Sequence, residues 1–137
     1  MRILALDVGG RRIGLAVSDD GERLASGRGW IERHGGQRDL AAVLAATRRE
    51  RAGLVVVGLP LALDGSDSPG TGRVRRFAES LARTGLEVRL WDERLTTAQA
   101  RRAGGSRRKG AIDERAAVLI LQSFLDARRG ESHCTSP

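Results

Sequence analysis

The apolar periodicity of the chain changes once, near residue 36, and this change restricts the folds open to it. Before that point, three short apolar segments follow one another and are separated by turn residues, as in a meander of antiparallel strands. After it, segments with helical spacing alternate with short apolar runs, which is typical of a sheet with parallel strands. We therefore predict an α/β fold with a mixed five-stranded sheet and helices on both faces.

The predicted elements follow from apolar spacing and turn signals. The run from Leu54 to Val57 is short, uninterrupted and β-branched, as is typical of a buried parallel strand. Thr96 and Gln99 have the spacing of a capping box and predict the start of a short helix. The predicted strands are 3–6, 13–17, 23–31, 54–57 and 86–91; the other predicted helices are 37–51, 74–82 and 112–129.

The length of 137 residues corresponds to one domain. We expect that domain over residues 1–129 and a disordered polar tail over residues 130–137. No run of about 18 apolar residues predicts a membrane span. Asp7 interrupts the first apolar segment too early for a signal peptide, so we expect a cytoplasmic protein.

The charge of the chain favours a phosphate-bearing partner. The net charge is +7, and Lys109 is the single lysine among 24 basic residues. Arginine binds phosphate in a bidentate manner, although coding bias explains much of the total, so the placement of the arginines carries the argument. With no tyrosine, two phenylalanines and two tryptophans, a base-stacking platform is not expected. The single Cys134 excludes an internal disulfide.

Three positions carry acids where solvated charges are uncommon. Asp7 ends the first predicted strand, where sheets with helical crossovers bind ligands. Asp113 precedes the first apolar pair of the last helix by three and four residues and shares its face, although a helix N-terminus also favours an acid. Asp92 and Glu93 follow the last strand, and only one of them can point into a site shared with the others. Glu114, next to Asp113, is expected to face solvent.

Carboxylates from two strand ends and one helix start can converge over one edge of the sheet. Oxygen ligands of this kind suit Mg²⁺ or Mn²⁺. Two such ions, about 3.5–4 Å apart, activate water and stabilise the leaving oxygen in phosphodiester hydrolysis. Since the chain offers no convincing protein nucleophile, the pattern predicts a metal-dependent nuclease.

Four segments carry a more specific pattern, and they occur in one order over residues 1 to about 129. They resemble the RuvX/YqgF family, whose members are named as Holliday junction resolvases or as nucleases of the 16S rRNA precursor. The segments are LDVGGRRIGLAVSD at 6–19, VGLPL at 57–61 with Asp64-Gly65, DERLTT at 92–97, and Ile112-Asp113 with Ala116-Ala117.

The resemblance implies an RNase H-like fold and a nuclease that matures the 5′ end of small-subunit ribosomal RNA. It also implies that the acids of the site are Asp7, Glu93 and Asp113, which would bind Mg²⁺ or Mn²⁺, with two ions expected. The choice of Glu93 over Asp92 rests on the resemblance. Family members often carry a polar residue where this chain has Ala62, so no side-chain role is expected at that position.

Basic residues accompany each of these acids and are candidate contacts to nucleic-acid phosphates. The first follows Asp7 in the glycine-rich hairpin, the second follows Glu93, and the remainder precede Asp113 in a glycine-flanked loop. The predicted nucleic-acid-binding residues are Arg12, Arg94, Arg107, Arg108 and Lys109.

Other functions are compatible with parts of the sequence. Four-way DNA junctions are an alternative substrate to structured RNA, and a two-fold junction would suit a homodimer. An ATPase or sugar-kinase relative also begins with an acid and glycines, but such enzymes clamp nucleotide between two domains. A non-catalytic nucleic-acid-binding protein would show salt-sensitive RNA binding without cleavage.

Overall fold

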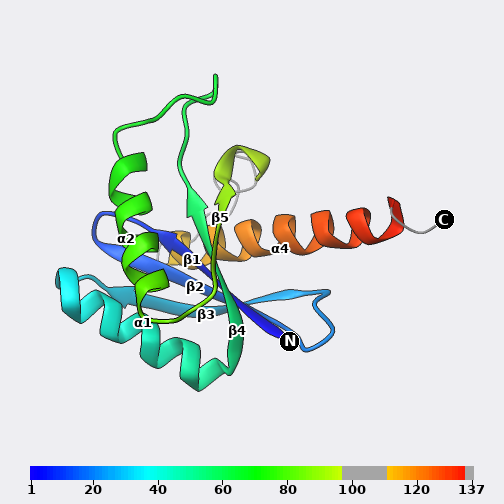
Figure 1. Cartoon of the computed structure of the whole chain (residues 1–137), viewed down its shortest axis with the longest axis horizontal. Coiled ribbons are helices and arrows are strands. Elements are labelled where there is room, and N and C mark those ends of the chain that lie inside the picture. The colour runs from blue at the N-terminus through cyan, green and yellow to red at the C-terminus, as the bar shows by residue number, and fades with distance from the viewer. Residues whose placement is uncertain (97–110, 135–137) are drawn as a thin grey trace.

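A computed structural model describes residues 1–96 and 111–134 and contains a five-stranded mixed sheet in the order β3-β2-β1-β4-β5 (Figure 1). Strands β1, β2 and β3 form an antiparallel meander, and β4 and β5 add parallel to β1. The strands are β1 Arg2–Val8, β2 Arg12–Ser18, β3 Ala25–Glu32, β4 Ala52–Leu59 and β5 Val88–Asp92. The helices are α1 Gly36–Glu50, α2 Thr71–Arg83, the 3-10 turn η1 Glu93–Leu95 and α4 Ala111–Cys134.

Helices cover both faces of the sheet, as the sequence predicts. Helices α1 and α2 lie on one face and α4 crosses the other (Figure 1). Strand β1 is central, and its alternate residues supply both cores: Leu4 and Leu6 pack toward α1 and α2, whereas Ile3 and Ala5 pack under α4. All four are completely buried. Burial on both faces explains why the run shows no polar alternation.

The predicted α/β class, mixed five-stranded sheet and two-sided covering are confirmed, but some element boundaries differ. Strand β3 begins at Ala25, two residues later than predicted, after a turn in which Asp19 accepts hydrogen bonds from the backbone N–H groups of Arg23 and Leu24. Helix α4 continues to Cys134, five residues beyond its predicted end and into the predicted tail. The remaining tail residues, 135–137, lie outside the described residues.

The short helix predicted from Thr96 falls largely on residues 97–110, outside the described part of the chain. Thr96 itself ends η1, and its hydroxyl donates to the Glu93 carbonyl. Within residues 1–96 and 111–134, no helix is long and apolar enough to cross a membrane.

The start of α4 lies directly on the sheet because β2 and β3 present glycines beneath it. A Cβ atom at Gly14 would lie 1.9 Å from the backbone oxygen of Asp113, and one at Gly27 would lie 2.6 Å from the Glu114 carboxylate. Glu114 accepts a hydrogen bond from the Gly29 N–H at 2.5 Å. The prediction that Glu114 faces solvent is therefore wrong: its carboxylate turns back onto β3.

We expect Gly14→Ala to lower the free energy of unfolding by about 1–3 kcal/mol or more, because backbone atoms of α4 block the new methyl group. Gly10→Ala is the matched control, since a Cβ there meets no atom within 4 Å. Urea titration followed by circular dichroism measures both variants. Equal stability of Gly14→Ala and the parent chain would contradict this close packing.

Candidate functional site

Asp7 lies near the end of β1, on the face of the sheet that α4 covers. Ile3 and Ala5 precede it at two-residue spacing and belong to the core under α4, so strand alternation places Asp7 on the same side. The residue is only 7% exposed. A carboxylate this buried requires polar or ionic partners.

A glycine lies beside Asp7 in each neighbouring strand. Its partner in β2 is Gly14. On the other side, the register pairs Leu6 with Val57, and one step further places Gly58 of β4 level with Asp7. Because neither glycine has a side chain, the sheet is open above both positions, and other elements can approach Asp7 there.

Glu93 and Asp113 occupy these two openings. A Cβ at Gly58 would lie 2.5 Å from Cδ1 of Ile120 in α4 and 2.8 Å from Oε1 of Glu93, which follows β5 directly and begins η1. The backbone of Asp113 covers Gly14, and its Oδ1 would lie 3.3 Å from a Cβ at Gly9. The structure thus brings the second and third predicted acids to the glycines around the first. All three lie at the edge formed by the carboxyl ends of β1, β4 and β5.

The donor atoms at this edge suit a hard divalent cation, since all three side chains offer carboxylate oxygens. Each of the three residues takes part in a polar or electrostatic interaction. Over the described residues, however, no three His, Cys, Asp or Glu side chains come close enough together to hold one metal ion. The acids share one edge of the sheet without forming a closed three-ligand cluster.

Asp92 belongs to a separate ion pair. Its Oδ2 lies 2.6 Å from Nη2 of Arg94, and its Oδ1 accepts from the Arg94 backbone N–H at 2.8 Å, which caps η1. Hydrogen bonding to the guanidinium, opposed by partial burial, holds the pKa of Asp92 below its ordinary value. Asp92 is therefore committed to Arg94, whereas the neighbouring Glu93 lies over β4. The sequence alone leaves this choice open.

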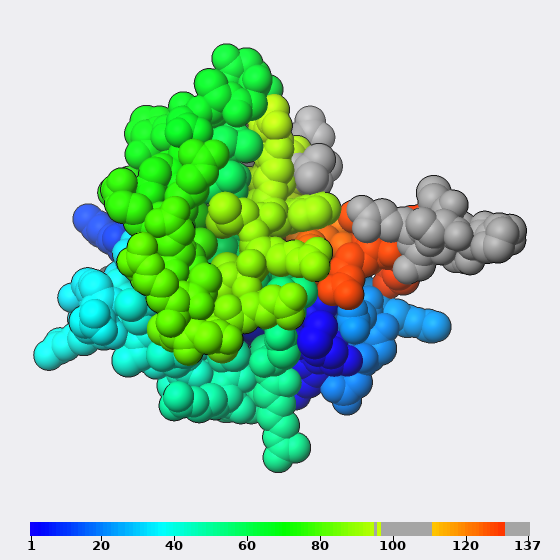
Figure 2. Space-filling model, in the orientation of Figure 1, coloured from blue at the N-terminus to red at the C-terminus, as the bar shows by residue number. Residues whose placement is uncertain are grey.

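The residues predicted to contact phosphate differ in the partners that they bind in the structure. Arg12 pairs with Glu32 of β3, with Nε 3.2 Å from Oε1. Arg94 also donates to the Leu63 carbonyl at 3.3 Å, which joins η1 to the loop between β4 and α2. That loop projects beyond the sheet edge (Figures 1 and 2). Arg107, Arg108 and Lys109 lie outside the described residues.

Sequence reasoning missed a small cavity at the same edge, on the side of α1 and α2. Its volume is about 50 Å³. Two arginines reach it, Arg33 from the loop between β3 and α1 and Arg73 from α2. Neither stands beside an acid of the site in sequence, so no local signal marks them. The cavity is lined by Val8, Gly9, Gly10, Arg33, Pro60, Gly70, Arg73 and Val74.

Two solved resolvases have a similar fold. T. thermophilus RuvC in complex with a Holliday junction substrate aligns over 95% of this chain and 97% of its own, with a TM-score of 0.61 and 17% identity. The fowlpox virus Holliday junction resolvase aligns over 93% and 99%, with a TM-score of 0.59 and 12% identity. At these identities the likeness establishes the fold, which is the RNase H-like fold of resolvases.

Sequence comparison adds the family. Residues 1–127 match the family described as "RuvX: Holliday junction resolvase". A Thermus thermophilus protein named "Putative pre-16S rRNA nuclease" is 48% identical over 131 residues, covering 91% of this chain and 97% of the relative. A protein of the same name from Anaeromyxobacter is 45% identical, covering 93% of this chain and 98% of the relative. The chain belongs to the RuvX family, as the resemblance implied.

We expect Arg94→Gln to raise the pKa of Asp92 toward its ordinary value, because the main group that stabilises its charged form is removed. Carbon-detected NMR titration of side-chain carboxyl groups measures the shift. Because the pKa of Asp92 is lower in the folded than in the unfolded state, its ionised carboxylate stabilises the fold at pH values above the unfolded-state pKa. The parent protein loses this stabilisation as the pH falls through the lowered, folded-state pKa.

Asp19 is the matched control for this titration. Backbone N–H groups of Arg23 and Leu24 hold its pKa low without any contribution from Arg94. Its titration should be the same in both proteins. An unchanged Asp92 in Arg94→Gln would show that the ion pair does not hold that carboxyl.

Proposed function

We propose that this protein is a divalent-metal-dependent nuclease that hydrolyses phosphodiester bonds in structured nucleic acid. The observation that carries the proposal is the placement of Glu93 and Asp113 over the two glycines that flank Asp7. The names of the RuvX relatives and the shared fold with junction resolvases support it.

Asp7, Glu93 and Asp113 are the residues that would hold the cation, with two ions expected. When bound, such ions supply Lewis-acid stabilisation of the phosphate and a water activated for attack. The chain itself contributes position: Asp7 is fixed in the central strand and Asp113 in a helix turn seated on Gly14. Burial of Asp7 excludes water from one side of the site and strengthens its electrostatic interactions.

The proposed substrate is the 5′ end of the 16S rRNA precursor, since curated relatives over nearly the whole chain carry that name. This substrate agrees with a cytoplasmic location. Four-way DNA junctions are the second candidate, favoured by the family description and by the fold shared with resolvases. A homodimer would suit the two-fold symmetry of a junction.

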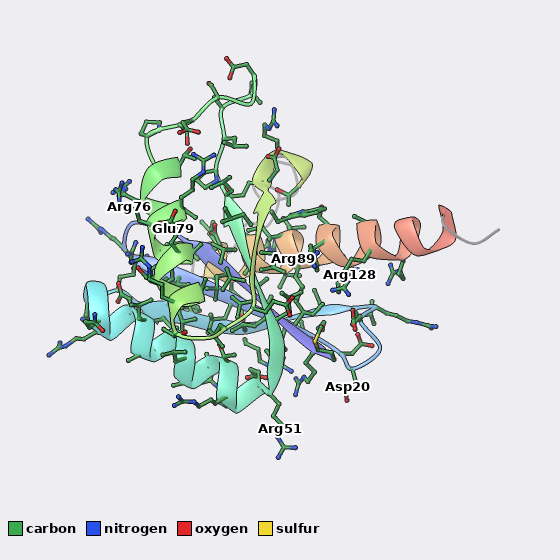
Figure 3. The ribbon with its side chains drawn as sticks, in the orientation of Figure 1. Asp20, Arg51, Arg76, Glu79, Arg89 and Arg128 are labelled. Atoms are coloured by element: carbon green, nitrogen blue, oxygen red, sulfur yellow. The ribbon has the colours of Figure 1, made fainter. Side chains whose placement is uncertain are left out.

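We expect Asp7→Asn to reduce Mg²⁺- or Mn²⁺-dependent cleavage while nucleic-acid binding persists. The loss should exceed the roughly 10–100-fold typical of residues that only support a metal ligand. Asp20→Asn is the matched control, because Asp20 is exposed in the turn at the opposite end of the sheet (Figure 3). Cleavage that survives unchanged in Asp7→Asn would disprove the assignment of the site.

A comparison of substrates separates the candidates. The parent protein with Mn²⁺ is offered a ribosomal RNA precursor, a four-way DNA junction and single-stranded controls, and the cleavage rates are ranked. We expect the RNA precursor to be cut fastest. Faster cutting of the junction would favour the resolvase function, whereas salt-sensitive binding without any cleavage would favour a non-catalytic protein.

A further inference from the structure

The cavity beside the β1–β2 turn has the composition of an anion site. Its eight lining residues include two arginines and four that are glycine or proline, and none is acidic. Its volume of about 50 Å³ is several times the roughly 10–15 Å³ that one water molecule requires. The cavity is therefore positive and large enough for a small anionic group.

Arg33 is fixed before any ligand arrives. Its Nε lies 3.1 Å from Oδ2 of Asp39, its Nη1 donates to the Gly9 carbonyl at 2.8 Å, and its guanidinium lies 5.8 Å from the Phe77 ring centroid. Asp39 is 1% exposed and also accepts from the backbone N–H of His34. These bonds use two of the five N–H donors of Arg33 and leave others for a ligand.

The charge of Asp39 is secured by the same contacts. Burial raises its pKa, but the His34 N–H and the Arg33 guanidinium outweigh that effect, so the pKa is lowered on balance. The ion pair stays formed at neutral pH, and it holds the guanidinium plane in one orientation. A donor oriented in advance loses little entropy when it binds an anion.

Arg73 supplies the second charge from α2. It is exposed, and within residues 1–96 and 111–134 it forms no ion pair. Helix α2 has 13 residues and carries no acid in its first turn, so its positive end is not neutralised locally. The net charge at the cavity therefore comes from Arg73, because Arg33 is balanced by Asp39.

Gly9 connects the cavity to the acidic edge. It lines the cavity, and a Cβ on the same residue would lie 3.3 Å from Oδ1 of Asp113. The two sites are thus separated by the thickness of one backbone turn. A nucleic-acid strand that crosses this turn with one phosphate at the acids would bring a neighbouring phosphate to the cavity.

We infer that the cavity binds a phosphodiester group of the substrate strand, adjacent to the bond that is cut, through Arg33, Arg73 and the Gly9-Gly10 turn. This inference rests on the proposed nuclease function and adds a positioning subsite to it. Free inorganic phosphate has the same charge chemistry, so the experiment must distinguish the two sources.

Binding is measured in the Asp7→Asn protein, which leaves the strand intact, by amide NMR titration. The probes are inorganic phosphate and a single-stranded RNA without terminal phosphates. We expect both to shift the amide signals of Gly9, Gly10 and Gly70, which line the cavity. Arg73→Gln should weaken RNA binding roughly fivefold to tenfold and lower the salt slope by about one. Arg83→Gln, at the other end of α2, removes the same charge and should change neither.

Three outcomes of this experiment would overturn the inference. If neither probe shifts these signals, or if Arg73→Gln and Arg83→Gln weaken RNA binding equally, the cavity is not a phosphate subsite. If only inorganic phosphate shifts them, the cavity takes free phosphate and not the strand. If the cavity fails as a phosphate subsite but Asp7→Asn still abolishes metal-dependent cleavage, the proposed nuclease function stands. If the protein cleaves no substrate but Arg73→Gln still weakens RNA binding, only the proposed nuclease function is overturned.

Discussion

Close contact between the first turn of α4 and strand β2 determines where the acids of this protein lie. The backbone of Asp113 sits on Gly14 at a separation that no side chain at that position would permit. Gly14 is also the partner of Asp7 in the antiparallel ladder. One glycine therefore sets both the height of α4 above the sheet and the distance of its first acid from the central strand.

The opposite side of Asp7 is built in the same way. Gly58 leaves an opening in β4, and Glu93 enters it from the end of β5, where η1 turns the chain back over the sheet. The ion pair of Asp92 with Arg94 fixes that turn. The acidic edge thus depends on missing side chains as much as on those present, and it adjoins a positive cavity across the β1–β2 turn.

Much of this arrangement could be predicted from sequence, because its signals are local. The apolar run around Ile3 and the uninterrupted Val55–Val57 give the central strands, and Asp113 stands out on an apolar helix face. Contacts between distant segments could not be predicted. Glu114 turns back onto β3 because Gly27 leaves room for its carboxylate and the backbone N–H of Gly29 donates to it. The orientation of Arg33 depends on Asp39 and Gly9, which no spacing rule connects to it.

Paramagnetic broadening of amide NMR signals by Mn²⁺ tests most directly whether this edge of the sheet gathers a cation. We predict saturable broadening in the parent protein that is strongest at Gly9, Gly58 and Asp113, and much weaker broadening at these positions in Asp7→Asn. Broadening centred on the Asp19-Asp20 turn, or unaffected by the loss of the Asp7 carboxylate, would contradict the account.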